Sequence, residues 1–298
     1  MVRELLLGDN PFIGVSHLAQ EKAREGAKEA SLENKVRVFE AAVESGATGF
    51  TFSTEESNLE LLTYLSIHNS DPLNKMNFYI LVPYAQSYIR RANVGGTQAL
   101  IGSMLKDMLY SRAMTSSMLT ALMSSNLERF VGPFIESELS PYLNMFCKER
   151  VVVLLHEVLT ELIMAFNLID LLNSLDSYME RKLEVGFGLE TRNLGHLHRY
   201  LSLTGYNPKY LMTPFNPLGY QMAWNKEAVE EAVKELGGET RIIAINVLAS
   251  GAASLDEAIE YISKFKNNIY AVATASMRPN RIRENFQKLY QAFLSDGK

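Results

Sequence analysis

The stretch RIIAINVLASGAASLDEAIEYISKFKNNIYAVATAS, residues 241–276, contains a short apolar run, an amphipathic segment and a second apolar run. The amphipathic segment begins at Ser254, a residue type that is favoured at helix N-caps. The two flanking runs are apolar throughout, which is typical of strands buried on both faces of a parallel sheet. The stretch therefore predicts a strand, a helix and a second strand parallel to the first.

The same alternation fills the rest of the chain. Each apolar run is followed by polar or glycine-bearing residues and then by a segment with helical spacing. The runs are RELLLGD, TGFTFST, NFYILVPY, VVVLLHE, LEVGFGLE, YLMTPFN, RIIAINVL and IYAVATAS. Eight such units in a row predict an α/β fold, a closed (β/α)8 TIM barrel, rather than an open doubly wound sheet. We expect residues 1–298 to form one domain.

Helix boundaries are marked by capping residues. Ser31 and Asn225 each precede a helical pattern and are predicted N-caps. Gly46 and Gly237 follow the same two patterns and are predicted left-handed C-caps.

Residues 85–150 separate the third apolar run from the fourth and are too many for one helix and two loops. We predict a helical insertion between strand 3 and strand 4. Its methionines are Met104, Met108, Met114, Met118 and Met123. Such methionines are typical of core or helix–helix contacts, and the alternative is an adaptable ligand surface. Because the insertion follows the C-terminal end of a barrel strand, it is a candidate lid or homo-oligomer interface.

The composition and charge of the chain argue against nucleic-acid-binding and membrane proteins. The net charge is −5 and no long block of lysine and arginine occurs, which argues against a nucleic-acid footprint or a basic membrane patch. No apolar run approaches the roughly 20 residues of a membrane span. The single cysteine, Cys147, fits a reducing compartment. We expect a cytoplasmic protein that acts on small molecules.

The residues that end the strands form a polar ring at one mouth of the predicted barrel, where barrel enzymes place their active sites. His156 directly follows VVVLL and is a candidate proton-transfer group, although it is equally well interpreted as a core histidine bonded to a backbone carbonyl. The second proton-transfer group would be a carboxylate. The ring comprises Asp9, Asn10, Ser53, Thr54, Glu55, Glu56, Tyr84, His156, Glu157, Glu190, Asn216, Asn246 and Ser276.

A divalent metal is an alternative use of the ring. Asp9, Glu55, His156 and Glu190 offer oxygen ligands and an imidazole. The sequence contains no spaced ligand motif such as HExxH or CxxC, so we expect no metal site.

The stretch SMRPNRIRENF, residues 276–286, opens the last predicted helix with a serine and three arginines. A phosphate at a helix N-terminus would meet free amides and a guanidinium. The stretch resembles the C-terminal coenzyme motif of the aldo-keto reductases, at Ser276, Arg281, Ile282, Glu284 and Asn285. The resemblance implies that Ser276 and Arg281 hold the 2′-phosphate of NADP and that Glu284 and Asn285 reach its adenine. The alternative is helix packing, with Arg281 in a surface ion pair.

Other parts of the chain are similar to the same family. FNPLG from Phe215 and IAINVLASG from Ile243 resemble its sixth- and seventh-strand segments, and LLHE implies that His156 is its catalytic histidine. The other catalytic residues differ. Ser53 and Asn58 stand where the family has aspartate and tyrosine, and the third strand, FYILVPY, lacks the lysine.

The residues that contact the nicotinamide in that family differ too. Gly188 and Leu189 stand in place of its fifth-strand Ser-Asn pair, and Ile245 stands in place of its seventh-strand aromatic residue. The leading hypothesis is therefore an enzyme that binds a phosphorylated small molecule or a nucleotide near Ser276 and Arg281. It would use His156 with Glu55, Glu56 or Glu190 for isomerase, epimerase or lyase chemistry.

Two alternatives stay open. In one, the chain is a divergent NADP-dependent reductase in which Tyr84 or His156 supplies the proton. In the other, it is a non-catalytic ligand-binding or assembly protein.

Overall fold

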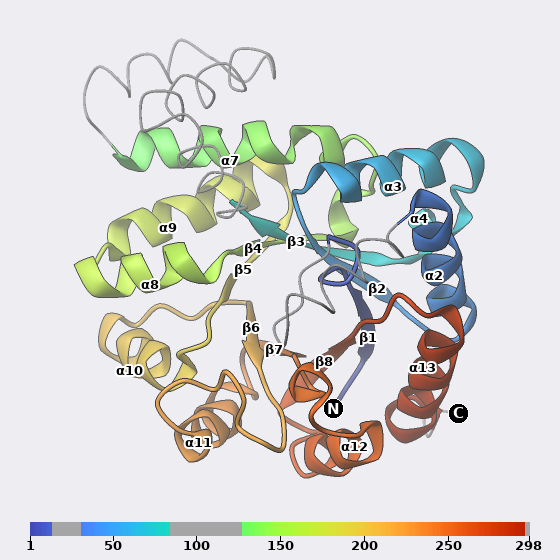
Figure 1. Ribbon diagram of the computed structural model, residues 1–298. Helices are drawn as coiled ribbons and strands as arrows, with labels where there is room; N and C mark the ends of the chain where they lie inside the picture. Colours follow the sequence, from blue (N-terminus) through green and yellow to red (C-terminus); the bar gives the residue numbers. More distant parts are fainter. Residues whose placement is uncertain (14–30, 84–126, 296–298) are drawn as a thin grey trace, which may run out of the picture.

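The computed structural model describes residues 1–13, 31–83 and 127–295. Eight parallel strands pair in sequence order and close into a barrel, as predicted (Figure 1). They are β1 (Glu4–Gly8), β2 (Gly49–Ser53), β3 (Asn77–Val82), β4 (Val151–Leu155), β5 (Gly186–Glu190), β6 (Tyr210–Pro214), β7 (Arg241–Ile245) and β8 (Ile269–Thr274). Each of the eight apolar runs thus contains one strand.

Helices surround the barrel (Figure 1). The described ones are α2 (Leu32–Glu44), α3 (Glu56–His68), α4 (Asp71–Lys75), α7 (Leu127–Leu143), α8 (Glu157–Phe166), α9 (Ile169–Tyr178), α10 (Leu194–Thr204), α11 (Lys226–Leu236), α12 (Leu255–Ser263) and α13 (Pro279–Phe293). Short turns of helix occur at η1 (Lys148–Arg150), η2 (Met179–Leu183) and η3 (Ala249–Gly251). In the described ranges, no helix has the length and apolar character needed to cross a membrane.

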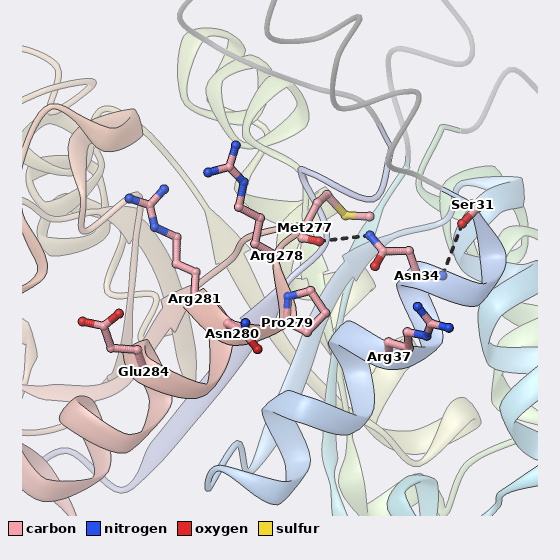
Figure 2. A pocket seen from close by; sticks show the side chains of 9 residues that line it. All are labelled: Ser31, Asn34, Arg37, Met277, Arg278, Pro279, Asn280, Arg281 and Glu284. Carbon is pink, nitrogen blue, oxygen red and sulfur yellow. Dashed lines mark hydrogen bonds between the residues drawn. The ribbon is translucent and has the colours of Figure 1, made fainter.

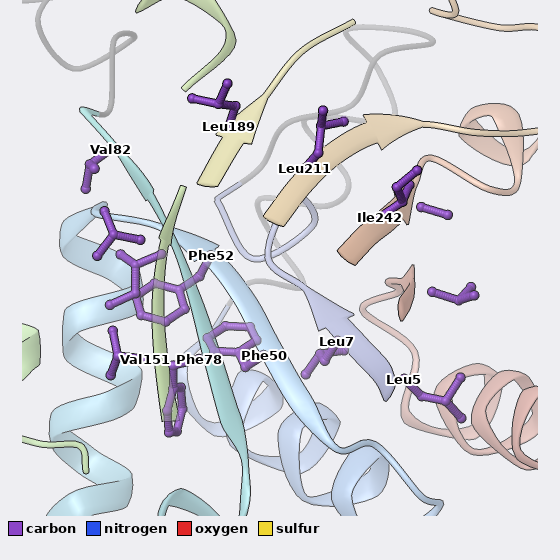
Figure 3. Close-up of a cluster of buried hydrophobic side chains, with 14 of the residues drawn as sticks. Leu5, Leu7, Phe50, Phe52, Phe78, Val82, Val151, Leu189, Leu211 and Ile242 are labelled. Carbon is purple, nitrogen blue, oxygen red and sulfur yellow. The ribbon is translucent and has the colours of Figure 1, made fainter. Parts of the chain in front are cut away.

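The core has two layers because successive side chains of a strand point to opposite faces. Outward-facing residues such as Phe50, Phe52 and Phe78 pack under the helices (Figure 3). Inward-facing residues such as Tyr79 and Met212 fill the barrel itself. Apolar material on both faces explains why the strands read as uninterrupted apolar runs.

The N-terminal end of the barrel is closed by a polar cluster around Glu4. This carboxylate accepts hydrogen bonds from the hydroxyls of Tyr79 (2.9 Å) and Tyr270 (2.6 Å) and from the side-chain amide of Asn77 (2.9 Å). The guanidinium of Arg241 lies 5.2 Å from the ring of Tyr270, within the range of a cation–π contact. The polar groups of this cluster are hydrogen-bonded to one another. The active sites of barrel enzymes lie at the opposite, C-terminal end of the strands.

The predicted caps agree with the structure, with one correction. Ser31 and Asn225 accept from backbone N–H groups of α2 and α11, and Ser254 forms a capping box with Glu257. Gly46 is left-handed, with φ of 102°. Gly237 is not left-handed, since its φ is −67°. Glycine is needed there because a Cβ would lie 2.5 Å from the carbonyl oxygen of Asn268.

The predicted insertion of residues 85–150 contains α7 and η1, which lie between β3 and β4 in the chain. Tyr84 and the five methionines fall outside the described residues. The proposed roles of the insertion as a lid or a homo-oligomer interface therefore stay predictions.

Candidate active site

Asp9 follows β1 directly and is anchored at the C-terminal mouth of the barrel. Its Oδ2 accepts from the backbone N–H of Ser53 (2.8 Å), from the Ser53 hydroxyl (2.9 Å) and from the Asn58 side-chain amide (2.8 Å). Asn58 also donates to the backbone oxygen of Ser53 over 2.9 Å. Ser53 ends β2 and Asn58 lies in the first turns of α3, so three elements meet at this carboxylate.

Glu190 ends β5 on the inward face and is only 6 % exposed. Its Oε2 accepts a hydrogen bond of 3.2 Å from the backbone N–H of Glu157, which begins α8. Burial, reinforced by the negative charges of Glu157 and Asp9, raises the pKa of Glu190 to about 8. The side chain is therefore mostly protonated at neutral pH and can donate a proton.

Arg192, in the loop after β5, forms an ion pair with Glu157. Its Nε lies 2.5 Å from Oε2 of Glu157. Burial raises the pKa of Glu157, and the nearby guanidinium of Arg192 opposes that change. The ion pair fixes the start of α8 beside Glu190.

His156 caps α8 instead of pointing to a backbone carbonyl. Its Nδ1 accepts from the backbone N–H of Val158 over 3.3 Å. Burial, aided by the positive charge of Arg192, lowers the pKa of His156 to about 4. The ring is thus neutral at physiological pH, and because Nδ1 is an acceptor, the proton resides on Nε2. A neutral ring with a proton on Nε2 can donate a hydrogen bond, and the predicted role of His156 in proton transfer stays a prediction.

The other predicted catalytic residues lie at the start of α3 or outside the described ranges. Glu55 is half-buried, and its backbone oxygen accepts from the hydroxyl of Tyr142 over 3.1 Å. Glu56 is exposed in the first turn of α3, where an acidic residue suits the helix dipole. Tyr84 is not among the described residues.

Two further residues of the predicted ring, Asn216 and Asn246, form hydrogen bonds with nearby loop residues. The side chain of Asn216 both donates to and accepts from the backbone of Tyr220. Asn246 donates to the side chain of Gln221 over 3.0 Å and accepts from the backbone of Ser250 over 2.9 Å. Both asparagines therefore stabilise loops at the mouth.

A separate pocket of about 810 Å³ lies where the N-terminal ends of α2 and α13 meet (Figure 2). Arg278 and Arg281 extend in the same direction from the start of α13 (Figure 2), and Arg37 of α2 also lines the pocket. Arg278 and Arg281 form no ion pair with any residue that the structure describes, whereas Arg37 pairs with Glu33 over 2.6 Å. The pocket thus combines two helix N-termini with two exposed guanidiniums, which is an arrangement suited to an anion.

The structure separates the four predicted coenzyme-binding residues of the motif. Arg281 and Glu284 line the pocket. The Ser276 hydroxyl accepts from the backbone N–H of Arg278 over 3.1 Å, next to the pocket. Asn285 does not reach the pocket, because it is buried and donates to Thr274 Oγ1 over 3.3 Å. Its predicted contact with the adenine stays a prediction.

Some residues of both sites were missed by sequence reasoning. Arg37 and Asn34 come from a helix far away in the sequence, and the Asn34 side chain donates to the backbone oxygen of Met277 over 3.0 Å. Arg192 stands in a loop with no motif around it. Among the residues described, no three acidic, histidine or cysteine side chains are grouped as a metal ion would require.

Comparisons with known proteins give a fold but no sequence relative. No protein-family model matches the chain, and no curated protein matches it by sequence. Solved structures do match. A Pseudomonas aeruginosa protein classed provisionally as an aldo-keto reductase is 13% identical, with 98% of this chain and 91% of that chain covered and a TM-score of 0.55.

Two further aldo-keto reductases are similar. The holo form from Bacillus halodurans is 10% identical, with coverage of 97% of this chain and 87% of that chain and a TM-score of 0.55. The enzyme from a Medee basin deep-sea metagenome library is 12% identical, with 85% and 80% covered and a TM-score of 0.50. The chain therefore has the (β/α)8 barrel fold of the aldo-keto reductases, in a sequence that has diverged from theirs.

Proposed function

We propose that the chain is an NADP(H)-dependent oxidoreductase that reduces a carbonyl group, with a proton donor different from that of the aldo-keto reductases. The observation that carries the proposal is the pocket at the start of α13, in which Arg278 and Arg281 are both exposed and face the same space. This choice reverses the order of our sequence hypotheses. The fold comparisons, which return aldo-keto reductases, support the reductase better than the isomerase, epimerase or lyase alternative.

The residues present fit the phosphate end of such a coenzyme. Arg278 and Arg281 would hold the 2′-phosphate by charge-assisted hydrogen bonds, and the N-terminal amides of α13 would add to them. Arg37 would contribute less, because Glu33 already neutralises it. Since Asn285 is turned inward, recognition of the adenine would depend on Glu284 and its neighbours rather than on the whole motif.

When bound, the coenzyme supplies a hydride to the carbonyl carbon. The chain must then deliver a proton to the carbonyl oxygen, which becomes an alkoxide. Glu190 is the best placed described group, because it is buried at the mouth and mostly protonated at neutral pH. Its O–H bond breaks, an O–H bond forms on the substrate oxygen, and the negative charge remains on the Glu190 carboxylate.

His156 would orient the substrate. Its neutral ring presents Nε2–H as a donor to a carbonyl oxygen, without giving up that proton. This role matches the position of the family's catalytic histidine. Tyr84 remains an alternative proton donor from the sequence hypothesis.

The proposal is tested by following hydride transfer. The wild-type protein is incubated with deuterium-labelled NADPH and a panel of small aldehydes and ketones, and the alcohol products are examined by mass spectrometry. Coenzyme-derived deuterium in a product supports the proposal. Absence of NADPH binding at millimolar concentration would reject it. Conversion of a sugar phosphate without any coenzyme would support the isomerase, epimerase or lyase alternative, and ligand binding without turnover would support the non-catalytic one.

A further inference from the structure

Trp224 is the only tryptophan of the chain and stands in the loop between β6 and α11, at the C-terminal mouth of the barrel. The residue is 55 % exposed. We propose that Trp224 is a substrate-binding platform, on which an aromatic ring or another flat apolar group of the substrate stacks. The inference rests on the proposed function for the reaction, since it names the class of carbonyl compound that would be reduced. Binding to the platform itself needs no coenzyme.

The first argument is the way in which the indole is held between α10 and α11, which pack side by side (Figure 1). The indole stacks on the imidazole of His196 in the first turn of α10, with 4.3 Å between the ring centroids and 12° between the planes. The guanidinium of Arg199, one turn further along α10, lies 5.7 Å from the indole centroid. A Cβ at Gly195 would lie 3.2 Å from the indole, so the glycine leaves room for the ring. The indole therefore lies against α10 while more than half of the residue is exposed.

The imidazole behind the indole is itself fixed. Nδ1 of His196 donates to the side-chain oxygen of Asn193 over 2.9 Å, because a carboxamide oxygen can only accept. The Asn193 amide donates in turn to Glu161 of α8 over 3.5 Å, and the same carboxylate accepts from the hydroxyl of Thr191 over 2.8 Å. A binding surface that is already ordered loses little conformational entropy when a ligand is bound.

The second argument is the backbone conformation of Trp224. Its φ of 77° lies in the left-handed region, where a bulky residue is a genuine outlier. Gln221 in the same loop has a φ of 59°. Such conformations persist only where the surroundings impose them, and they cluster at active sites and ligand clamps. Here the buried Met222 and the capping side chain of Asn225 hold the loop on either side of the tryptophan. The strain at this exposed residue favours a functional role over a purely structural one.

The third argument is the position of Trp224 relative to the candidate proton donor. The backbone N–H of Ala223 donates to the backbone oxygen of Arg192 over 2.8 Å, and Arg192 is two residues after Glu190. With about 3.8 Å between consecutive Cα atoms, this path places the Cα atoms of Trp224 and Glu190 within about 20 Å of each other. An elongated substrate can therefore have its carbonyl at Glu190 and its flat group at Trp224.

The chemistry of the indole defines the substrate class. Aromatic rings prefer offset-stacked arrangements with one another, and such pairs add to affinity beyond the area that they bury. A small aldehyde does not extend far enough to contact both Glu190 and Trp224. The platform therefore predicts a preference for aldehydes or ketones that carry an aromatic ring several bonds away from the carbonyl group.

The first experiment uses the single tryptophan as a reporter in the coenzyme-free protein. 4-Nitrobenzyl alcohol, a flat ring that quenches indole emission, is titrated while the emission intensity and lifetime are recorded. Stacking lowers the intensity without shortening the lifetime, whereas collision also shortens the lifetime. The association constant is expected to be about 10-fold that of free N-acetyltryptophanamide. It should not change in Leu203→Ala, whose exposed side chain lies at the far end of α10. Purely collisional quenching would overturn the proposal.

The second experiment measures specificity with NADPH. Aldehydes with a terminal phenyl ring and different numbers of methylene groups are compared with plain alkanals of equal length. In the wild type, KM is expected to fall in the phenyl series once the chain is long enough to reach Trp224. Trp224→Gly keeps the left-handed backbone without steric cost, and it should raise KM by about 3- to 10-fold for those compounds only. Trp224→Phe keeps a ring and should show a smaller rise.

Equal changes of KM for the two series in Trp224→Gly would overturn the proposal, as would a wild type that does not distinguish them. If Trp224→Gly fails to fold, His196→Ala removes the ring behind the indole instead, and the same comparison of the two series decides. Failure of the proposed function would appear differently, as no reduction of any aldehyde with the stacking of 4-nitrobenzyl alcohol still present.

Discussion

Nε of Arg192 lies 2.5 Å from Oε2 of Glu157, and the backbone N–H of that same glutamate donates to Glu190. One guanidinium in a loop thus fixes the start of α8 against the buried acid at the end of β5. Burying a paired charge is tolerated, whereas removing one partner leaves the other uncompensated. Arg192 is therefore expected to influence the ionisation of Glu157, Glu190 and His156.

Replacement of Glu190 tests its role as the proton donor. Glu190→Gln keeps the shape but cannot donate the proton, so kcat should fall by about 10²–10⁴-fold while NADPH affinity is retained. In the wild type, the rate should decline above about pH 8, where Glu190 loses its proton. Steady-state kinetics over pH check both points. Asp71→Asn, exposed at the start of α4, is the control, and equal losses in the two variants would contradict the assignment.

The same residue has a consequence for stability. Its pKa in the folded state is about 8, above the ordinary value of 4.5, so the folded protein holds more protons than the unfolded chain between these values. Stability is therefore lost as pH rises through this window. The difference in free energy of unfolding between Glu190→Gln and wild type should grow by at most about 1.4 kcal/mol per pH unit from pH 4.5 to 8 and then level off. Urea denaturation over pH measures this difference, and a constant difference would argue against a buried, protonated Glu190.

His156 should stay neutral through the physiological range. With a pKa of about 4, its imidazole resonances should not move between pH 8 and about pH 5.5 in an NMR titration. Arg192→Met removes the neighbouring positive charge and should raise the pKa of His156. The variant His156→Asn assigns the resonances. A midpoint near the ordinary value of 6.5 in the wild type would show that the ring is not held neutral.

Much of the fold could be predicted from the sequence. All eight strands lie within the quoted apolar runs because burial on both faces leaves an uninterrupted apolar pattern. The N-caps at Ser31, Asn225 and Ser254 were readable because capping depends on residues close in sequence. Gly237 was misassigned, since its need for glycine comes from the close approach of Asn268 rather than from its own backbone angles.

The sites were less predictable because they depend on convergence in space. In the sequence, Ser53 and Asn58 stand where the aldo-keto reductases have two catalytic residues. Only the structure shows that both side chains donate hydrogen bonds to Asp9. His156 was located correctly at the end of β4, but its cap to Val158 and its low pKa come from three-dimensional surroundings. The inward turn of Asn285 toward Thr274 likewise depends on packing that a motif does not encode.

Gly188 offers a test of how closely β5 and β6 pack in the barrel. A Cβ at this position would lie 2.4 Å from the backbone oxygen of Tyr210 on the neighbouring strand. Gly188→Ala should destabilise the protein by about 1–3 kcal/mol, because backbone cannot yield as a flexible side chain does. Gly238→Ala is the control, since nothing lies within 4 Å of its Cβ position. Equal urea midpoints for the two variants would contradict the described strand register.

We propose that the pocket between α2 and α13 holds the 2′-phosphate of a nicotinamide coenzyme, and phosphorus NMR of NADP⁺ tests this most directly. The 2′-phosphate resonance should shift on addition of wild-type protein and of Arg283→Met, whose arginine pairs with Glu44 and does not line the pocket. In Arg281→Met the affinity should fall by about 10- to 100-fold and the shift should be lost at the same concentrations. A 2′-phosphate resonance that does not move with wild-type protein, or that moves equally with Arg281→Met, would contradict the claim.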